Sequence, residues 1–252
     1  MTRFKLVIEY DGGPFVGWQK QQNGPSVQAA LEEAIRQFSG EAVSVTGGGR
    51  TDTGVHALGQ VIHIDLNRTI AADKLREAIN AQLRPAPVVV ISAEEVSEDF
   101  HARFSATSRS YLYRILSRRA PPTIEKGRVW WVSRSLDSDA MSEAGQALLG
   151  YHDFSSFRAS ECQASTPLKT LTHLAITRHG DEVWLEVSAR SFLHNQVRII
   201  TGTLCQVGLG RWSISAVGDA LNARDRKAAG PTAPPEGLYL VAIRYTDWPI
   251  SR

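Results

Sequence analysis

The sequence Gly47-Gly48-Gly49-Arg50-Thr51-Asp52-Thr53-Gly54-Val55-His56-Ala57 places one carboxylate in a glycine-rich loop between two strand-like stretches. Each glycine costs roughly 0.5 to 1 kcal/mol relative to alanine inside a helix or strand, so three in succession argue against a regular element. Glycine does allow positive φ angles and the close approach of another surface. We therefore interpret the stretch as a tight loop that presents Arg50 and Asp52 to a partner.

The residues on either side of this loop predict alternating strands and helices, each bounded by turn or capping residues. In the first half we expect strands at 4–10, 43–46, 61–66 and 88–96, and helices at 27–39 and 72–83. In the second half we expect strands at 103–116, 129–132, 172–177, 183–189 and 238–245, and helices at 137–150, 195–207 and 215–221. This order predicts an α+β fold of two similar subdomains, residues 1–105 and 106–252. Each would be a mostly antiparallel sheet with helices on one face, and a catalytic cleft would lie between them.

The composition narrows the class of protein. Of the 252 residues, 42% are hydrophobic, which is enough for substantial cores. The first ten residues alternate like a strand and lack the apolar core of a signal peptide, and no apolar run approaches the ~20 residues that span a bilayer. Cys162 and Cys205 have no partner at metal-binding spacing, so neither a disulfide framework nor a structural metal is indicated. We expect a cytoplasmic protein that does not bind membranes.

Positive charge is concentrated between residues 101 and 134, where eight basic residues accompany one acidic residue. Aromatic side chains lie among them: Phe104, Tyr111, Tyr113, Trp130 and Trp131. Arginine suits phosphates and aromatic rings suit bases, so the segment is typical of a nucleic-acid surface. A solvated strand face is the alternative interpretation.

Two functions for Asp52 fit the sequence poorly. Asp52-Thr53-Gly54 is the tripeptide of aspartic proteases, but those enzymes need a second copy that this chain lacks. Glycine-rich backbone also binds phosphate, yet no Gly-Lys-Ser/Thr follows the glycines, and the carboxylate would repel the anion.

Two functions remain open from these residues alone. An aspartate is ionised at neutral pH without a helping base, and a neighbouring guanidinium such as that of Arg50 favours the ionised form. Such a carboxylate can act as a nucleophile toward an electrophilic carbon. Alternatively, Arg50 and Asp52 form an ion pair that only closes the loop.

The stretch 49–57 resembles the signature of the tRNA pseudouridine synthase A family. Other motifs of the resemblance follow in order along nearly the whole chain, at 10–12, 15–19, 100–107, 111–114, 152–158, 192–198 and 236–240. One departure is Gln196, which stands where the family often has methionine and whose amide needs hydrogen-bond partners if it is buried.

The resemblance implies an isomerase that converts uridine to pseudouridine at positions 38, 39 and 40 of the anticodon stem-loop of tRNA, without a cofactor or a metal. Asp52 would be the nucleophile, acting on a nucleotide flipped out of its stack at a cost of a few kcal/mol. Arg50 would fill the vacated space and pair with Asp52. Tyr111 would stack on the flipped base and is the natural partner for proton transfer.

The resemblance also implies a homodimer and a set of residues that contact RNA. These residues are Phe100, His101, Ala102, Arg103, Phe104, Arg119, Arg158, Glu161, Cys162, Gln163, Ala164 and Ser165. The rival hypothesis is a non-catalytic RNA-binding module in which Asp52 only shapes the loop. A pure binder gains nothing from an acid that faces phosphates, which favours the enzyme.

Overall fold

The computed structural model describes residues 1–245, which form two compact units. The first consists of Met1–Arg109 together with the stretch that begins at Tyr239, and the second is Ser110–Leu238. The sequence placed the boundary at 105/106 and assigned the last strand to the second subdomain, whereas most of that strand lies in the first unit. Residues 246–252, which the sequence also assigned to the second subdomain, lie outside the described residues.

The first unit is built around a sheet with the strand order β4-β1-β3-β10. Its strands are β1 (Thr2–Tyr10), β2 (Thr46–Gly47), β3 (His56–Leu66), β4 (Val88–Val96) and β10 (Leu238–Tyr245). β1 runs antiparallel to both β3 and β4, while β10 lies parallel to β3, with Tyr239 opposite His56. The short β2 pairs with β3, so the stretch between residues 48 and 55 is a loop that leaves and re-enters the same sheet.

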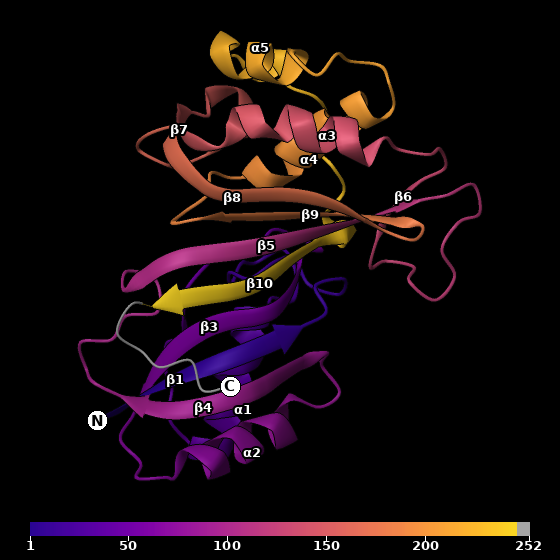
Figure 1. Ribbon diagram of the computed structural model, residues 1–252. Coiled ribbons are helices and arrows are strands. Elements are labelled where there is room, and N and C mark those ends of the chain that lie inside the picture. The colour runs from indigo at the N-terminus through magenta and orange to yellow at the C-terminus, as the bar shows by residue number, and fades with distance from the viewer. Residues whose placement is uncertain (246–252) are drawn as a thin grey trace. The chain divides into compact units, whose positions relative to one another are not determined.

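Two helices, α1 (Val27–Ser39) and α2 (Ala72–Leu83), complete the first unit. Ser26 caps α1 by accepting the Ala29 N–H, and Gly40 ends it at a φ of 76°. α2 packs against α1 and β4 (Figure 1). The helices bury the apolar faces expected from their sequence periodicity, which include Leu31, Ile35 and Ile79.

The second unit has the strand order β5-β9-β8-β7, with β6 beside β5. These strands are β5 (Ala106–Ser117), β6 (Trp130–Val132), β7 (Gly150–Asp153), β8 (Leu168–His179) and β9 (Glu182–Ala189). β8 is antiparallel to both β7 and β9, and the turn between β8 and β9 has Gly180 at a φ of 60°.

The helices of the second unit are α3 (Ser138–Gly145), α4 (Gln196–Gly208) and α5 (Ala216–Ala223). α3 packs against β8 and α4, and α5 contacts α3 (Figure 1). Asp137 caps α3 with its carboxylate, which accepts the N–H groups of Asp139 and Ala140. α4 is buried almost all round, which explains why Arg198 is its only charged residue.

The α+β class is confirmed, with mostly antiparallel strand pairs and helices packed on them. Three local expectations were wrong. Residues 43–45 are not a strand, so that β2 is only Thr46–Gly47, and residues 103–105 are not a strand either, so that β5 begins at Ala106. The helix expected to reach Gly150 ends at Gly145, followed by a 3₁₀ turn, Gln146–Leu148. Strand β7 was missed, because its four residues carry too short a pattern to recognise.

Replacing Gly202 in α4 by alanine is expected to destabilise the second unit, although alanine is the better helix former. A β-carbon on Gly202 would lie 1.8 Å from the carbonyl oxygen of Pro231, so the helix or the neighbouring backbone must move. Helix propensity alone favours alanine by about 1 kcal/mol. We expect instead a loss of about 2 kcal/mol or more in the free energy of unfolding, measured in urea.

Gly218→Ala in α5 is the matched control. The nearest atom to its added β-carbon is Ala147 Cβ at 3.8 Å, an ordinary contact. This variant should therefore keep or raise the free energy of unfolding, by up to about 1 kcal/mol. A Gly202→Ala protein as stable as Gly218→Ala would contradict the close approach of α4 to Pro231.

Candidate active site

Asp52 lies in the loop between β2 and β3, half-buried, with Thr51 buried before it and Thr53 exposed after it. Its carbonyl oxygen accepts the Val55 N–H at 3.1 Å, which closes a turn over four residues. Gly54 has a φ of 76° in this turn, a conformation that other residues rarely adopt. The turn fixes the main chain from which the carboxylate projects.

Residues 15–18 brace one side of the loop. The Trp18 N–H donates to the Thr51 carbonyl at 3.0 Å, and Thr53 Oγ1 donates to the Val16 carbonyl at 2.9 Å. Gly17, at a φ of 111°, must be glycine, because a β-carbon there would lie 2.9 Å from the Thr51 oxygen. The motif at 15–19 therefore shapes the Asp52 loop.

Residues 10–12 brace the loop through the buried side chain of His56. The Gly12 N–H donates to His56 Nδ1 at 3.0 Å, and the His56 ring stacks on Tyr239 with centroids 4.8 Å apart. The Tyr10 hydroxyl lies 2.8 Å from Thr51 Oγ1. A β-carbon on Gly12 would lie 2.0 Å from the Val55 oxygen, so the two backbones touch.

The glycine run serves close approach rather than unusual backbone angles. Gly47, Gly48 and Gly49 all have ordinary φ values, and the positive φ that the sequence suggested occurs instead at Gly54. A β-carbon on Gly47 would lie 2.6 Å from the Trp18 ring, and one on Gly48 would lie 2.7 Å from Ile243 Cδ1 and 2.9 Å from the Ala102 oxygen. The run thus lets the loop lie against three other segments.

Arg109 ties this loop to residues 100–105, a role that the sequence did not reveal. Its guanidinium donates to the Gly48 carbonyl from Nε at 3.0 Å and from Nη2 at 2.6 Å, and to the Arg103 carbonyl from Nη2 at 2.8 Å. Only 9% of Arg109 is exposed. The sequence did indicate that Arg109 points inward, because strand alternation puts it on the same face as Tyr111 and Tyr113, which are both buried.

The ion pair between Arg50 and Asp52 is not formed in the described part of the chain. The Arg50 side chain is exposed, and residues 1–245 give it no hydrogen bond or salt bridge. An exposed guanidinium gains little by leaving water for a surface pair, which accounts for the difference.

Of the five RNA-binding candidates at 100–104, three present their side chains outward. Phe100 and Ala102 are 1% and 0% exposed, so their side chains belong to the core of the first unit. His101 is half-buried, and Arg103 and Phe104 are exposed, with the Arg103 guanidinium 5.6 Å from the centre of the Phe104 ring. An exposed aromatic ring beside an arginine suits a stacked base and a phosphate.

Tyr111 lies in β5 within the second unit and is 8% exposed. Its ring meets the edge of Phe192, with centroids 5.1 Å apart. The remaining RNA candidates also belong to the second unit. Arg119, Glu161, Gln163 and Ser165 are exposed, whereas Arg158, Cys162 and Ala164 are half-buried.

Only one of the two polar atoms of the Gln196 amide has the hydrogen-bond partner that a buried amide needs. The residue is fully buried, and its Oε1 accepts the Leu193 N–H at 2.8 Å. Its Nε2, however, has no hydrogen-bond partner among the described residues. The amide therefore fixes the backbone turn ahead of α4 at the cost of one unpaired donor.

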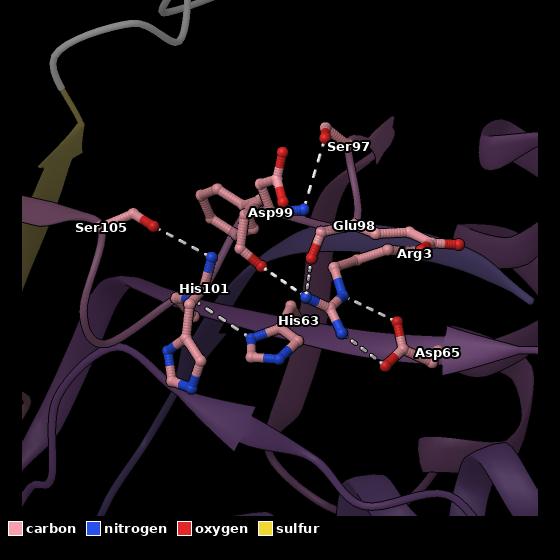
Figure 2. A network of polar contacts seen from close by, with 10 residues as sticks. Arg3, His63, Asp65, Ser97, Glu98, Asp99, His101 and Ser105 are labelled. Carbon is pink, nitrogen blue, oxygen red and sulfur yellow. Dashed lines mark hydrogen bonds and ion pairs between the residues drawn. The ribbon is translucent and has the colours of Figure 1, made fainter.

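His63 in β3 accepts the Ala102 N–H on Nδ1 at 3.1 Å and is 6% exposed (Figure 2). Beside it, Arg3 makes a two-pronged ion pair with Asp65, at 2.7 and 2.8 Å. Burial lowers the pKa of His63 to about 4, and the positive charge of Arg3 adds to the shift. His63 is therefore neutral in the folded protein, as its acceptor role requires.

Residues 1–245 contain no group of three or more His, Cys, Asp or Glu side chains placed to hold a metal ion. Among the helices of the same described range, none has the length and apolar character needed to cross a membrane.

Comparison with known proteins supports the sequence resemblance. A family profile described as tRNA pseudouridine synthase matches residues 6–105 and 144–246. A tRNA pseudouridine synthase A of Rhodospirillum centenum is 59% identical over 97% of this chain and all of its own length. The protein of the same name from Afipia carboxidovorans is 58% identical with the same coverage, and that from Rhodospirillum rubrum is 58% identical over 97% of this chain and 88% of its own length.

The lowered pKa of His63 predicts a loss of stability in acid. The unfolded chain takes up a proton near pH 6.5, whereas the folded protein resists protonation until about pH 4. The free energy of unfolding should therefore fall as the pH drops through this window, by about 2 kcal/mol between pH 7 and pH 5 from this residue. Urea unfolding at a series of pH values measures the effect.

His63→Asn should flatten this part of the pH profile, because the amide does not titrate. His173→Asn is the control, since His173 is an exposed histidine in β8. If His63→Asn retained the full wild-type slope between pH 7 and pH 5, the neutral buried state of His63 would be refuted.

Proposed function

Because the chain belongs to the tRNA pseudouridine synthase family, we propose that it converts uridine to pseudouridine at positions 38, 39 and 40 of the tRNA anticodon stem-loop, with Asp52 as the nucleophile. The protein is an isomerase that acts on tRNA. The assignment to Asp52 is supported chiefly by one observation. A half-buried carboxylate stands on a loop whose main chain is held from both sides by residues 10–12 and 15–18.

The reaction explains why a carboxylate suits this position. The bond between uracil N1 and the sugar breaks, and a bond from uracil C5 to the same sugar carbon forms. The C5 hydrogen leaves as a proton and N1 gains one, so atoms and electrons balance within one nucleotide. A carboxylate can attack the nucleotide without first being deprotonated by a base, and it is a good leaving group when uracil reattaches.

A uridine stacked in the anticodon stem is out of reach, so the nucleotide must be flipped out at a cost of a few kcal/mol. We propose that the exposed Arg50 side chain fills the space it vacates. Its lack of a hydrogen bond or ion pair within residues 1–245 supports this role, because the guanidinium loses no protein partner on binding. We propose that Tyr111 stacks on the flipped uracil and takes part in proton transfer.

The RNA surface includes the outward side chains of His101, Arg103 and Phe104. The remaining proposed contacts are Arg119, Arg158 and the loop 161–165, whose exposed side chains are compatible with this role. The main chain of Phe100 and Ala102 supports the surface, while their side chains remain in the core. We further propose that the enzyme acts as a homodimer in the cytoplasm.

Asp52→Asn is expected to lower pseudouridine formation by about 10³-fold or more while tRNA binding persists. The amide keeps the size of the side chain but cannot act as the nucleophile. Pseudouridine is mapped at positions 38 to 40 of an anticodon stem-loop substrate, and binding is measured by filter retention at a fixed salt concentration.

Asp73→Asn is the matched control, since Asp73 is an exposed acid of the same unit and undergoes the same change of charge. It should leave pseudouridine formation unchanged. Wild-type turnover by Asp52→Asn would remove Asp52 from the reaction and would favour a role in shaping the loop.

Tyr111→Phe is expected to reduce kcat by about 10²-fold or more with a smaller change in KM, because the ring can still stack but the hydroxyl is lost. Tyr113→Phe is the matched control in the same strand. Its hydroxyl donates to the Pro234 carbonyl at 2.7 Å, so its loss should lower stability by about 1 kcal/mol and leave kcat intact. Unchanged kcat in Tyr111→Phe would restrict Tyr111 to stacking.

A further inference from the structure

Residues 100–105, called here the RNA-facing segment, form neither helix nor strand. Most of their backbone N–H and carbonyl groups are nevertheless hydrogen-bonded. Within the segment, the His101 N–H donates to Ser105 Oγ at 3.0 Å, and the Ser105 N–H donates to the His101 carbonyl at 2.9 Å. The N–H groups of Arg103 and Phe104 both donate to His101 Nδ1, at 3.2 and 3.3 Å. The His101 side chain therefore closes the segment on itself.

Four further backbone groups of the segment are held by side chains from four different strands. Arg3 of β1 donates to the Phe100 carbonyl at 2.9 Å and also to that of Glu98. Arg109 of β5 holds the Arg103 carbonyl, and the buried Tyr245 hydroxyl of β10 donates to the Ala102 carbonyl at 2.7 Å. The fourth is His63 of β3, which accepts the Ala102 N–H (Figure 2).

His63 also begins a series of rings that reaches the surface. Its ring lies 4.8 Å from that of His101, and His101 lies 4.3 Å from Phe104, which is 71% exposed. A shift of Ala102 would therefore move the outward side chains on both sides of it. A segment already in its binding shape loses less conformational entropy when RNA binds.

We propose that His63 is a positioning residue for tRNA binding, which holds the Ala102 amide and thereby fixes His101, Arg103 and Phe104 in the shape that receives RNA. This inference rests on the proposed function, because it takes residues 100–105 as an RNA surface. His63 differs from the other three anchors in holding an N–H rather than a carbonyl. Only a neutral imidazole can do so, since a protonated ring has no acceptor.

The charges around His63 are arranged to keep this acceptor. Arg3 of β1 and His101 of the segment disfavour a proton on the ring, while Asp65 favours one. The two-pronged pair of Asp65 with Arg3 offsets much of that opposing charge. Lys5 of β1 stands opposite His63 in the strand pairing. Lys5 is held by Glu94 of β4 at 2.7 Å.

The test compares two amides at one position. His63→Asn places its side-chain oxygen near the site of Nδ1, so it should still accept the Ala102 N–H. His63→Gln is equally polar but carries its amide one bond farther out, near the site of Nε2. For the tRNA substrate we expect KM to rise about tenfold in His63→Gln and to stay within about twofold of wild type in His63→Asn, with kcat within about twofold in both.

Amide hydrogen exchange supplies the second measurement. The Ala102 N–H should exchange faster in His63→Gln than in wild type or His63→Asn, while amides of β1 keep their protection. This comparison applies even if His63→Gln is less stable, because a general loss of stability would raise exchange across the whole unit.

Three outcomes would overturn the proposal: an unchanged KM in His63→Gln, equal defects in Gln and Asn variants, or a fall in kcat without a rise in KM. Phe104→Ala separates this failure from that of the proposed function. If Phe104→Ala leaves KM unchanged, residues 100–105 are not an RNA surface and the inference fails. The loss of activity in Asp52→Asn would still support the proposed catalysis.

Discussion

The guanidinium of Arg109 joins the Asp52 loop to residues 100–105 within the first unit. It donates to the carbonyl oxygen of Gly48 before Asp52 and to that of Arg103, and it is almost fully buried. Burying a charge costs several kcal/mol, and hydrogen bonds from a charged donor offset that cost at roughly 1.5 to 3 kcal/mol each. The contact is possible only because Gly48 has no side chain, since a β-carbon there would meet Ile243 and the Ala102 oxygen.

Much of the fold was predictable because its signals are local. The helices at 27–39 and 72–83 and the strand at 88–96 have the predicted bounds, and Ser26 and Gly40 cap the first of these helices. Helix caps and apolar periodicity act over a few residues, so sequence displays them directly. The sequence does not show that β10 belongs to the first unit, because this depends on pairing with a strand about 180 residues earlier in the chain.

The candidate site, like the fold, has features that the sequence predicts and features that it does not. The position of the Asp52 loop was predictable from its glycines, whereas the nucleic-acid surface inferred from arginines and aromatic residues remains a prediction. The groups that hold both loops were not, because Arg109 is 61 residues from Gly48 and Tyr245 is 143 residues from Ala102. Sequence also could not show that Phe100 and Ala102 face inward, since a loop has no fixed period to tell its buried side from its exposed side.

Most of the hydrogen bonds that shape the Asp52 loop are made to its main-chain groups. Trp18 binds the carbonyl of Thr51, Gln60 binds both the N–H and the carbonyl of Gly49, and Arg109 binds the carbonyl of Gly48. The shape of the loop is therefore set by the backbone and by the absence of β-carbons at its glycines. In such a scaffold a change at a glycine or at an anchoring side chain alters the loop itself, whereas a change confined to the end of the Asp52 side chain removes the carboxylate and leaves these contacts in place.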